Sequence, residues 1–460
     1  MRPRHLFARN QLPTLLRLRP GAKAAELATD ASTSLATMTR ILNEAAGEVI
    51  RVGKAGRTVY FLRRALRGQA GEVPVYAVDH SGQVRSVGAL CLTAPAGAVW
   101  DVAALGWPVA AEFAQGVWPG LPYPLQDMCP QGFLGRSFAR QHAAALAVPD
   151  NPRQWTDDDV LHVLSQRVFD TSGHLIVGDS ALQQWLALKA QGQVPISASD
   201  LEQAYASLAE DAAAQGPAGS SAGGEFPKFT ALRALEGSQT PHVIVKFSGA
   251  EPSGTVRRWA DLLVCEHLAL QVLGSLPGLQ CAPSRILQSQ GRTYLEVERF
   301  DRHGLFGRSP LCSLATLEAA LLDRSSEDWA VLGAAMQAQG WLTAADTTRL
   351  RLIVAFGRLI KNTDMHKGNV SFVPADGLFR LAPVYDMLPM AYAPLAGGEL
   401  PVVTYAPGLP LPQDRELWQL ASAAAQSFWR AAASDVRISL AFRDICACNA
   451  EVLSRLHDLA

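Results

Sequence analysis

Three polar residues in the C-terminal half of the chain have the types and spacing of a phosphoryl-transfer site. The run 364–369 reads Asp-Met-His-Lys-Gly-Asn, and Asp386 follows it by 17 positions. The first Asp can accept a proton from a hydroxyl, while the Asn and the second Asp can hold Mg²⁺ against the phosphates of ATP. The pattern predicts a kinase-type site in which Asp364 is the base and Asn369 and Asp386 are the metal ligands.

The elements around this run are those that can place a base beside a metal ligand. Residues 350–360 have apolar side chains at helical spacing, and residues 370–373 and 379–385 read as two short strands. The intervening Pro-Ala-Asp-Gly at 374–377 is typical of a turn. A helix, a loop and a hairpin that ends near Asp386 are therefore expected.

A lysine and a glutamate that suit the ATP phosphates lie earlier in the chain. Lys246 is near the end of a β-branched run, 241–247, and a lysine on a buried strand can pair with the α- and β-phosphates. Glu266 lies in a strong helical pattern, 259–270, and can orient Lys246 through an ion pair. The alternatives are a solvent-facing lysine on an edge strand and a surface glutamate.

Two further segments complete the predicted nucleotide site. Residues 292–302 read as a strand that runs into a linker, so backbone groups near Glu298 and Phe300 can meet the adenine. Residues 215–230 are rich in glycine, including Gly223 and Gly224, and such a loop can approach phosphates closely. Its composition also suits a flexible linker, and no Gly-Lys-Ser/Thr follows it, so it is not a P-loop.

These motifs occur in an order and at a spacing that resemble HipA-like serine/threonine kinases, the toxin kinases of bacterial toxin–antitoxin systems. The resemblance rests on Ser-Ser-Ala-Gly-Gly-Glu at 220–225, Val-Lys at 245–246, Val-Glu-Arg-Phe-Asp at 297–301, the 364–369 run and Tyr-Asp at 385–386. It covers about residues 70–440. It implies an α+β, two-lobed, protein-kinase-like fold that uses ATP and Mg²⁺.

The resemblance also implies roles for individual residues. Lys246 contacts ATP, Glu298 and Phe300 contact the adenine, Asp364 is the base, and Asn369 and Asp386 hold Mg²⁺. Relatives autophosphorylate a serine of the glycine-rich loop, here Ser220 or Ser221. Known substrates are aminoacyl-tRNA synthetases, in particular the glutamyl enzyme, and a separate antitoxin is a possible partner.

Two departures from the family pattern keep a second enzyme class open. Many relatives place a lysine directly before the Asn, whereas Gly368 stands there and Lys367 precedes it. Phe226 occupies a position where relatives often carry Gln. The loop also looks like that of aminoglycoside and choline kinases, so a small-molecule kinase is the alternative.

The composition bounds the class of protein. Of 460 residues, 48% are hydrophobic and 18% charged, which is typical of a globular protein of two or three domains. The seven cysteines are scattered without a metal-like Cys-x-x-Cys, which favours reduced thiols in the cytoplasm. Neither a signal peptide nor a transmembrane segment is read from the sequence.

The N-terminal segment differs in charge from the rest. Residues 1–68 hold 13 Lys and Arg against four acidic residues, a net charge of +9, whereas the remainder carries −10. Helices are expected at 11–18, 22–28 and 33–46, the last capped by Ser32, followed by a hairpin at 49–62 with a basic tip at 53–57. This pattern resembles a winged helix-turn-helix domain, which favours DNA as a partner.

Within this segment, five residues are expected to meet DNA: Ser34, Thr37 and Arg40 at base edges or phosphates, and Lys54 and Arg57 at the backbone or minor groove. The alternatives are a winged helix that contacts protein, and solvated basic residues. The predicted organisation is a DNA-binding domain at 1–68, a HipA-like N-terminal subdomain at 69–200, and a kinase core with a helical C-terminal lobe at 201–460. A DNA-binding regulator with an inactive kinase body is a third reading.

Overall fold

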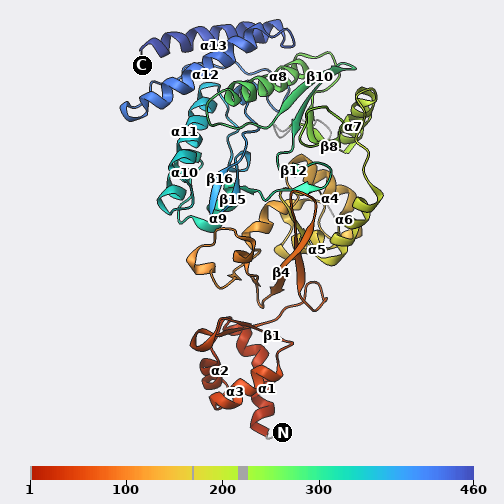
Figure 1. Cartoon of the computed structure of the whole chain (residues 1–460), viewed down its shortest axis with the longest axis vertical. Coiled ribbons are helices and arrows are strands. Elements are labelled where there is room, and N and C mark those ends of the chain that lie inside the picture. Colours follow the sequence, from red (N-terminus) through yellow and green to blue (C-terminus); the bar gives the residue numbers. More distant parts are fainter. Residues whose placement is uncertain (1–2, 168–169, 216–225, 460) are drawn as a thin grey trace.

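The computed structural model describes residues 3–167, 170–215 and 226–459. A small N-terminal unit lies at one end of the long axis and two C-terminal helices lie at the other (Figure 1). The N-terminal unit consists of helices α1 (Pro3–Leu18), α2 (Ala24–Asp30) and α3 (Leu35–Glu44), followed by strands β1 (Val49–Val52) and β2 (Val59–Leu62), which pair antiparallel.

The order of three helices and a hairpin is the one expected from the sequence, but two of the predicted details are wrong. Helix α3 begins after Ser34, whose side chain accepts a hydrogen bond from the Thr37 amide at 3.2 Å. Ser32 is not the N-cap, because its φ of 47° places it in a left-handed turn. Helix α1 begins at Pro3 rather than at residue 11, since proline is tolerated in the first turn of a helix.

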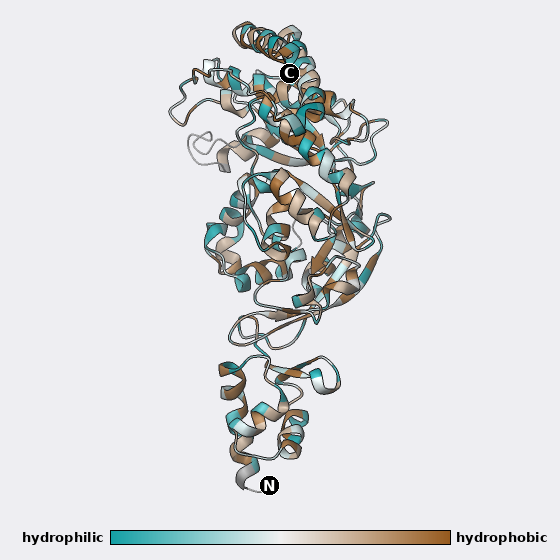
Figure 2. Cartoon of the chain, turned by 90° about the vertical axis from the view of Figure 1, so that its left-hand side faces the viewer, coloured by the Kyte–Doolittle hydropathy of each residue, from teal (hydrophilic) through white to brown (hydrophobic). Residues whose placement is uncertain are grey.

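The hairpin attaches the N-terminal unit to the middle of the chain. Ile50, Val52 and Phe61 form a buried apolar cluster with Cys91 of strand β4. Ion pairs from Arg64 to Asp158 and from Arg67 to Asp159 reinforce the attachment. Viewed from the side, the N-terminal unit mixes hydrophilic and hydrophobic residues along its helices (Figure 2), as expected of amphipathic helices around a small core.

The middle region is built on an antiparallel five-stranded sheet in the order β6-β5-β4-β3-β7. Most of its buried apolar side chains belong to the large core of the molecule, while Val78 and Ile176 belong to a smaller cluster with α6. Helices α4, α5 and α6 lie beside the sheet (Figure 1). The elements are β3 (Val73–Val78), β4 (Val84–Leu92), β5 (Ala98–Val99), β6 (Val117–Trp118), α4 (Gly132–Leu146), α5 (Asp157–Gln166), β7 (Leu175–Val177) and α6 (Asp179–Gln191).

The next region contains an antiparallel sheet in the order β10-β11-β9-β8, which packs against the long helix α8. Two short ladders, β12-β13 and β14-β15-β16, follow along the chain. The elements are α7 (Leu201–Gln215), β8 (Lys228–Leu232), β9 (His242–Phe247), α8 (Gly254–Gly274), β10 (Ser284–Ser289), β11 (Arg292–Glu298), β12 (Arg302–His303), β13 (Gly307–Arg308) and β14 (Cys312–Ser313).

The C-terminal lobe is mostly helical, as expected. The helix, loop and hairpin predicted around residues 350–385 are present as α11, the loop to residue 370, and β15 with β16. No helix in the described ranges is both long and apolar enough to cross a membrane. The elements are α9 (Leu314–Leu321), α10 (Trp329–Ala338), α11 (Ala344–Leu359), β15 (Ser371–Ala375), β16 (Leu378–Leu381), α12 (Arg415–Ser434) and α13 (Leu440–Leu459).

Candidate active site

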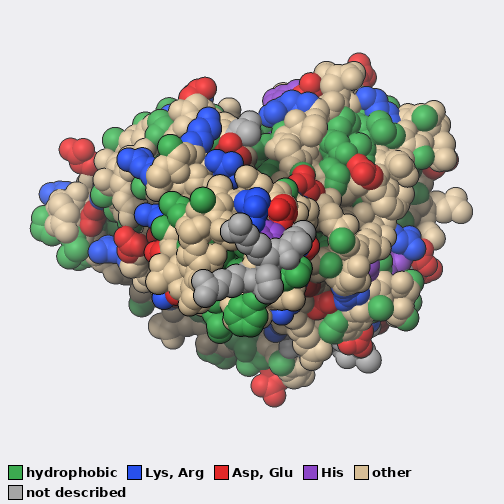
Figure 3. All heavy atoms as spheres, turned by 90° about the horizontal axis from the view of Figure 1, so that it is seen from below, with side chains coloured by type: hydrophobic (Ala, Val, Ile, Leu, Met, Phe, Trp, Pro, Cys, Tyr) green, Lys and Arg blue, Asp and Glu red, His purple; other side chains and the backbone are tan. Residues whose placement is uncertain are grey.

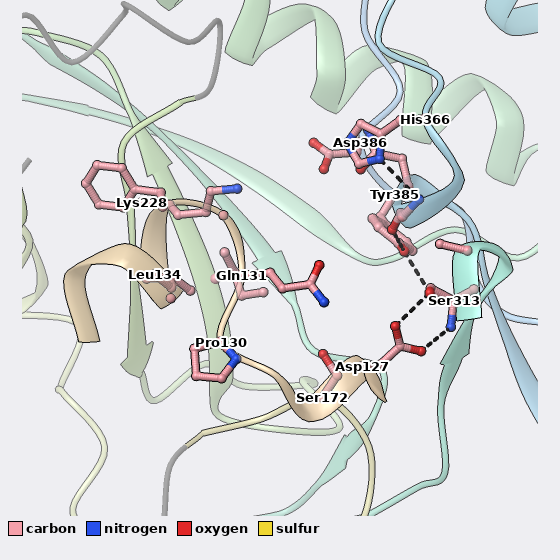
Figure 4. Close-up of a pocket in the computed structure, with 18 of the residues that line it drawn as sticks. Asp127, Pro130, Gln131, Leu134, Ser172, Lys228, Ser313, His366, Tyr385 and Asp386 are labelled. Carbon is pink, nitrogen blue, oxygen red and sulfur yellow. Dashed lines mark hydrogen bonds between the residues drawn. The ribbon is translucent and has the colours of Figure 1, made fainter. Parts of the chain in front are cut away.

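A cleft of about 1160 Å³ lies between the middle region and the C-terminal part of the chain. Figure 4 shows its two walls, with Gln131 and Lys228 on one side and His366 and Asp386 on the other. Seven residues that the sequence analysis singled out line this single cleft: Lys246, Glu266, Glu298, Phe300, Asp364, Asn369 and Asp386.

Lys246 lies at the centre of a buried charge cluster. Strand β9 is an inner strand between β11 and β8, so the edge-strand alternative for Lys246 is wrong. The Lys246 ammonium donates to both carboxylate oxygens of Glu266 at 2.8 Å, and it also contacts Asp386. Glu266 is fully buried in α8, so the surface alternative for it is wrong as well. Burial opposes a charged lysine, but the two carboxylates raise the pKa of Lys246 above its usual value.

Asp386 adopts a backbone conformation that is uncommon for a side-chain-bearing residue. Its φ is 55°, in the left-handed region, and such conformations gather at functional sites. Burial would raise the pKa of Asp386, but Lys246 more than offsets this and lowers it. The carboxylate is therefore charged at neutral pH and directed into the cleft.

Internal hydrogen bonds shape the loop that carries Asp364 and Asn369. The side-chain nitrogen Nδ2 of Asn369 donates to the Asp364 backbone carbonyl at 2.9 Å. The Asp364 backbone amide donates to Asn362 Oδ1 at 3.0 Å. His366 Nδ1 accepts from the Gly368 amide at 3.1 Å and caps a short 3-10 helix, Lys367–Asn369. The loop thus places the exposed Asp364 and the buried Asn369 on the same cleft wall.

The donor set at this wall fits Mg²⁺. Because the side-chain nitrogen of Asn369 donates to the backbone, its Oδ1 can serve as an oxygen ligand in the cleft that Asp386 also lines. Mg²⁺ prefers oxygen ligands and is usually held by one or two protein groups together with phosphates and water. No group of three or more His, Cys, Asp or Glu side chains in the described part of the chain could hold a metal, so a denser metal centre is not present there.

The two residues expected near adenine lie where the sheet meets the second lobe. Glu298 ends β11, and its carboxylate accepts from Arg233 and from Ser238, both at 2.6 Å. Phe300 packs against Tyr385 with ring centroids 5.8 Å apart. Both bonds end on Glu298 Oε1, and the Glu298 backbone amide donates to the Pro283 carbonyl at 2.8 Å, so the expected contact of this segment with adenine stays a prediction.

Two lysines have placements near the predicted phosphate site that the sequence analysis did not predict. Lys228 at the start of β8 extends toward Asp386 and His366 (Figure 4), a placement that sequence reasoning missed. The signal was its position near the end of the glycine-rich stretch, 215–230. Lys367, by contrast, forms ion pairs with Glu318 at 2.6 Å and Glu327 at 3.0 Å. The positive charge that the 364–369 run carries is therefore bound to neighbouring carboxylates.

The middle region forms one wall of the cleft, and the sequence analysis assigned no chemical role to the residues of that wall. Asp127 accepts from the Ser313 amide at 2.6 Å, from the Ser313 hydroxyl at 2.7 Å and from the Thr316 hydroxyl at 2.9 Å. Gln131 follows it and points into the space (Figure 4). Asp127 thus joins the middle region to the start of α9, and the segment 126–136 lines the same cleft as Asp364, Asn369 and Asp386.

Four predicted site residues lie outside the described residues. Ser220, Ser221, Gly223 and Gly224 fall within 216–225. The expected phosphate contacts of the glycines and the expected autophosphorylation of one serine therefore stay predictions.

The residues expected to meet DNA lie on the surface of the N-terminal unit, except that Thr37 is half-buried. Ser34 and Thr37 bond each other at 2.9 Å, and Arg40 lies 3.8 Å from Glu44. Lys54 and Arg57 are exposed at the hairpin tip and have no ion pair within the described chain. Several other arginines pair with carboxylates, and Figure 3 shows basic side chains scattered among acidic ones at this end. Arg9 and Arg19 pair with Glu48 and Asp30, which the net charge of +9 already counts, whereas Arg63 pairs with Glu72 outside residues 1–68.

Comparison with known proteins agrees with this architecture. Residues 69–186 match the family model of the YjjJ-like toxin middle domain, and residues 220–448 match that of the HipA-like C-terminal domain. The fold and the cleft therefore define a HipA-like protein with a kinase-type fold. Over 436 residues the chain is 37% identical to the toxin YjjJ of Escherichia coli (strain K12), covering 94% of this chain and 95% of that protein. The chain belongs to the YjjJ-like toxin family.

Solved structures resemble the chain more distantly. A chain from the complex of the Shewanella oneidensis MR-1 toxin–antitoxin proteins HipA and HipB with operator DNA matches with a TM-score of 0.50 at 15% identity, covering 84% of this chain and 95% of the matched one. At this identity the likeness shows the fold alone. The Helicobacter pylori proinflammatory kinase CtkA matches at a TM-score of 0.36 and 14% identity over 51% of this chain and 89% of its own, which is too low to support an argument.

Proposed function

We propose that this protein is an ATP-dependent serine/threonine protein kinase that acts as a toxin of a toxin–antitoxin system in the cytoplasm. The observation that carries the proposal is the Lys246–Glu266–Asp386 cluster in the same cleft as Asp364 and Asn369. A lysine, its orienting glutamate, a base and two oxygen ligands are the parts that phosphoryl transfer from ATP requires.

Each group has a defined task in the proposed reaction. The substrate hydroxyl oxygen forms a bond to the γ-phosphorus, the bond from that phosphorus to the β–γ bridging oxygen breaks, and ADP leaves. Asp364 accepts the hydroxyl proton. Lys246 and Lys228 hold the phosphates, while backbone groups near Glu298 and Phe300 hold the adenine. Asn369 and Asp386 would hold Mg²⁺, which neutralises phosphate charge when bound.

The class of substrate follows from the family resemblance. Relatives of the HipA type act on aminoacyl-tRNA synthetases, so a synthetase is the first protein target to test. The cleft is wide enough for a protein loop as well as a nucleotide, since its volume exceeds the usual range of small-molecule pockets, roughly 300–1,000 Å³. An autophosphorylated serine at 220 or 221 belongs to the same proposal.

Regulation through DNA and an antitoxin is the second part of the proposal. The N-terminal unit has the element order of a winged helix, and Lys54 and Arg57 at the tip of its hairpin are exposed and form no ion pair within the described ranges. A solved relative in fold was captured with an antitoxin and operator DNA. We therefore infer operator binding by residues 1–68, and an antitoxin partner is expected to contact this protein or its operator.

The decisive test of kinase activity uses two cleft variants and a matched control. Asp364→Ala and Asp386→Ala are each expected to abolish incorporation of label from ATP, both into protein and into the chain itself. Asp376→Ala removes an exposed carboxylate in the turn between β15 and β16 and is expected to behave as the wild type. Unchanged transfer in both cleft variants contradicts the proposal.

The same assay separates the two alternatives. Label that appears in an aminoglycoside or amino alcohol, and not in protein, identifies a small-molecule kinase. Operator binding with no label transferred to any acceptor identifies a regulator with an inactive kinase body. Growth arrest on expression that persists in the Asp364→Ala variant argues against kinase action as the source of toxicity.

A further inference from the structure

A second, smaller cavity of about 280 Å³ lies behind the main cleft. Its walls come from β8 and β9, from α6 of the middle region, and from the β12-β13 hairpin. Asp170 and Arg299 line both cavities, so they form a shared partition. None of the proposed catalytic residues lines the smaller cavity, and the inference drawn from it does not depend on the proposed function.

Three arginines gather at this cavity, and two of them are fully paired. Arg299 contacts Asp170 at 2.5 Å and Asp301 at 2.9 Å. Arg302 contacts Asp170 at 3.0 Å and Asp301 at 2.7 Å. Both also donate to the Thr171 carbonyl. Two carboxylates therefore balance two guanidinium groups, and no acidic charge is left over.

Arg308 is the third arginine, and its side chain has no ion-pair partner in the described part of the chain. It lies directly opposite Arg302 in the β12-β13 pair, where like charges destabilise one another. Only 8% of Arg308 is exposed, yet its side chain makes no hydrogen bond or ion pair within the described chain. Burial and the neighbouring Arg302 lower the pKa of Arg308, and the more distant attraction of Asp170 and Asp301 does not offset them.

Burial of a cation without a partner destabilises the folded state unless a bound ligand supplies a negative charge. The Arg308 guanidinium lines the cavity, and a guanidinium can bind an oxyanion through two parallel hydrogen bonds. Trp185 and Phe306 add apolar walls, with their rings 6.2 Å apart and edge to face. Such walls suit a small organic group attached to the anion.

We propose that this cavity is a binding site for a small organic oxyanion, with Arg308 as its charged anchor and Trp185 and Phe306 as its apolar walls. Phosphate monoesters and monocarboxylates share the required chemistry. Because Asp170 and Arg299 separate the two cavities, a ligand bound here lies against the wall of the main cleft.

The test is calorimetric titration of the full chain with methyl phosphate and, separately, with butyrate. The wild type is expected to bind at least one of them, and Arg308→Met is expected to weaken that binding about ten-fold or more, since charge-assisted hydrogen bonds are lost. Lys228→Met removes a cation of the main cleft instead and should leave this binding unchanged. The two probes distinguish a phosphate ligand from a carboxylate ligand.

A second variant tests the proposal even if Arg308→Met fails to fold. Gln193→Glu keeps nearly the same shape at the cavity wall but adds a negative charge, so it should weaken anion binding while Arg308 stays in place. Arg455→Met, on the exposed face of α13, controls for the loss of any one positive charge and should bind as the wild type. No binding of either probe to the wild type, or binding that Arg308→Met and Gln193→Glu leave intact, overturns the proposal.

Discussion

Lys246 on strand β9 donates to both carboxylate oxygens of Glu266 on helix α8, each at 2.8 Å, and both side chains are buried. This ion pair fixes the ammonium group at the base of the cleft, where it also meets Asp386. Because two carboxylates hold the buried ammonium group, the Lys246 side chain is restricted to one conformation. The Lys246 ammonium is therefore already held in the cleft when no ligand is bound.

Replacement of Glu266, which orients Lys246, is expected to slow phosphate transfer without abolishing nucleotide binding in the cleft. Glu266→Gln keeps the shape of the side chain but weakens its hold on Lys246, and misplacement of a catalytic group can cost roughly 100-fold in rate. Steady-state transfer of label from ATP measures the effect. Glu451→Gln, on the exposed side of α13, is the matched control and should retain full activity.

Removal of the Asp386 carboxylate is expected to abolish the response of stability to Mg²⁺. With nucleotide at about 100 times its Kd, binding should add about 2.7 kcal/mol to the free energy of unfolding of the wild type. In Asp386→Asn the added Mg²⁺ should give little of this gain, because the amide keeps one oxygen but loses the negative charge of the carboxylate. Thermal unfolding with ATP, with and without a chelator, measures the difference. An equal Mg²⁺-dependent shift in both proteins contradicts the assignment of Asp386.

Acid is expected to weaken the fold through Asp301. Burial alone would raise the pKa of Asp301, but Arg299 and Arg302 overcome this and lower it to about 2. A lowered carboxyl pKa stabilises the folded state fully above the unfolded value, 3.8, and that contribution, about 2 kcal/mol, is lost as the pH falls toward 2.

Urea unfolding of the wild type and of Asp301→Asn tests this. The difference in the free energy of unfolding should be large at pH 5 and smaller at pH 3. Asp376→Asn, which alters an exposed carboxylate, should follow the wild type at both pH values. A difference for Asp301→Asn that stays constant between the two pH values excludes the ion-pair explanation.

The hairpin tip of the N-terminal unit is expected to contact DNA phosphates. Lys54→Ala and Arg57→Ala should each weaken DNA binding and reduce the slope of log K against log salt by about 0.9. Fluorescence anisotropy with operator fragments over a range of salt measures both effects. Arg9→Ala is the control, because Arg9 is already paired with Glu48 and should contribute less to DNA binding. Equal slopes for all three variants argue against a DNA contact by the tip.

Local patterns were sufficient for much of the fold. The helix that precedes the 364–369 run, the hairpin after it and the strand that carries Lys246 depend on spacing within short stretches, and the structure contains each of them. The cap of α3 was misplaced by two residues because Ser32 and Ser34 are both suitable cap residues. Only the backbone conformation separates them, since Ser32 is left-handed and Ser34 is extended.

The sequence by itself determined which groups are available for chemistry: a lysine, a glutamate, two aspartates and an asparagine in kinase order. Only the tertiary structure decided what each of those groups, and each cation near them, is paired with. It joins Lys246 to Glu266, binds Lys367 to Glu318, brings Lys228 to the cleft and leaves Arg308 without an ion pair to any carboxylate among the described residues. The physical reason is that side-chain pairing depends on distances between elements far apart in the chain, which spacing along one segment does not contain.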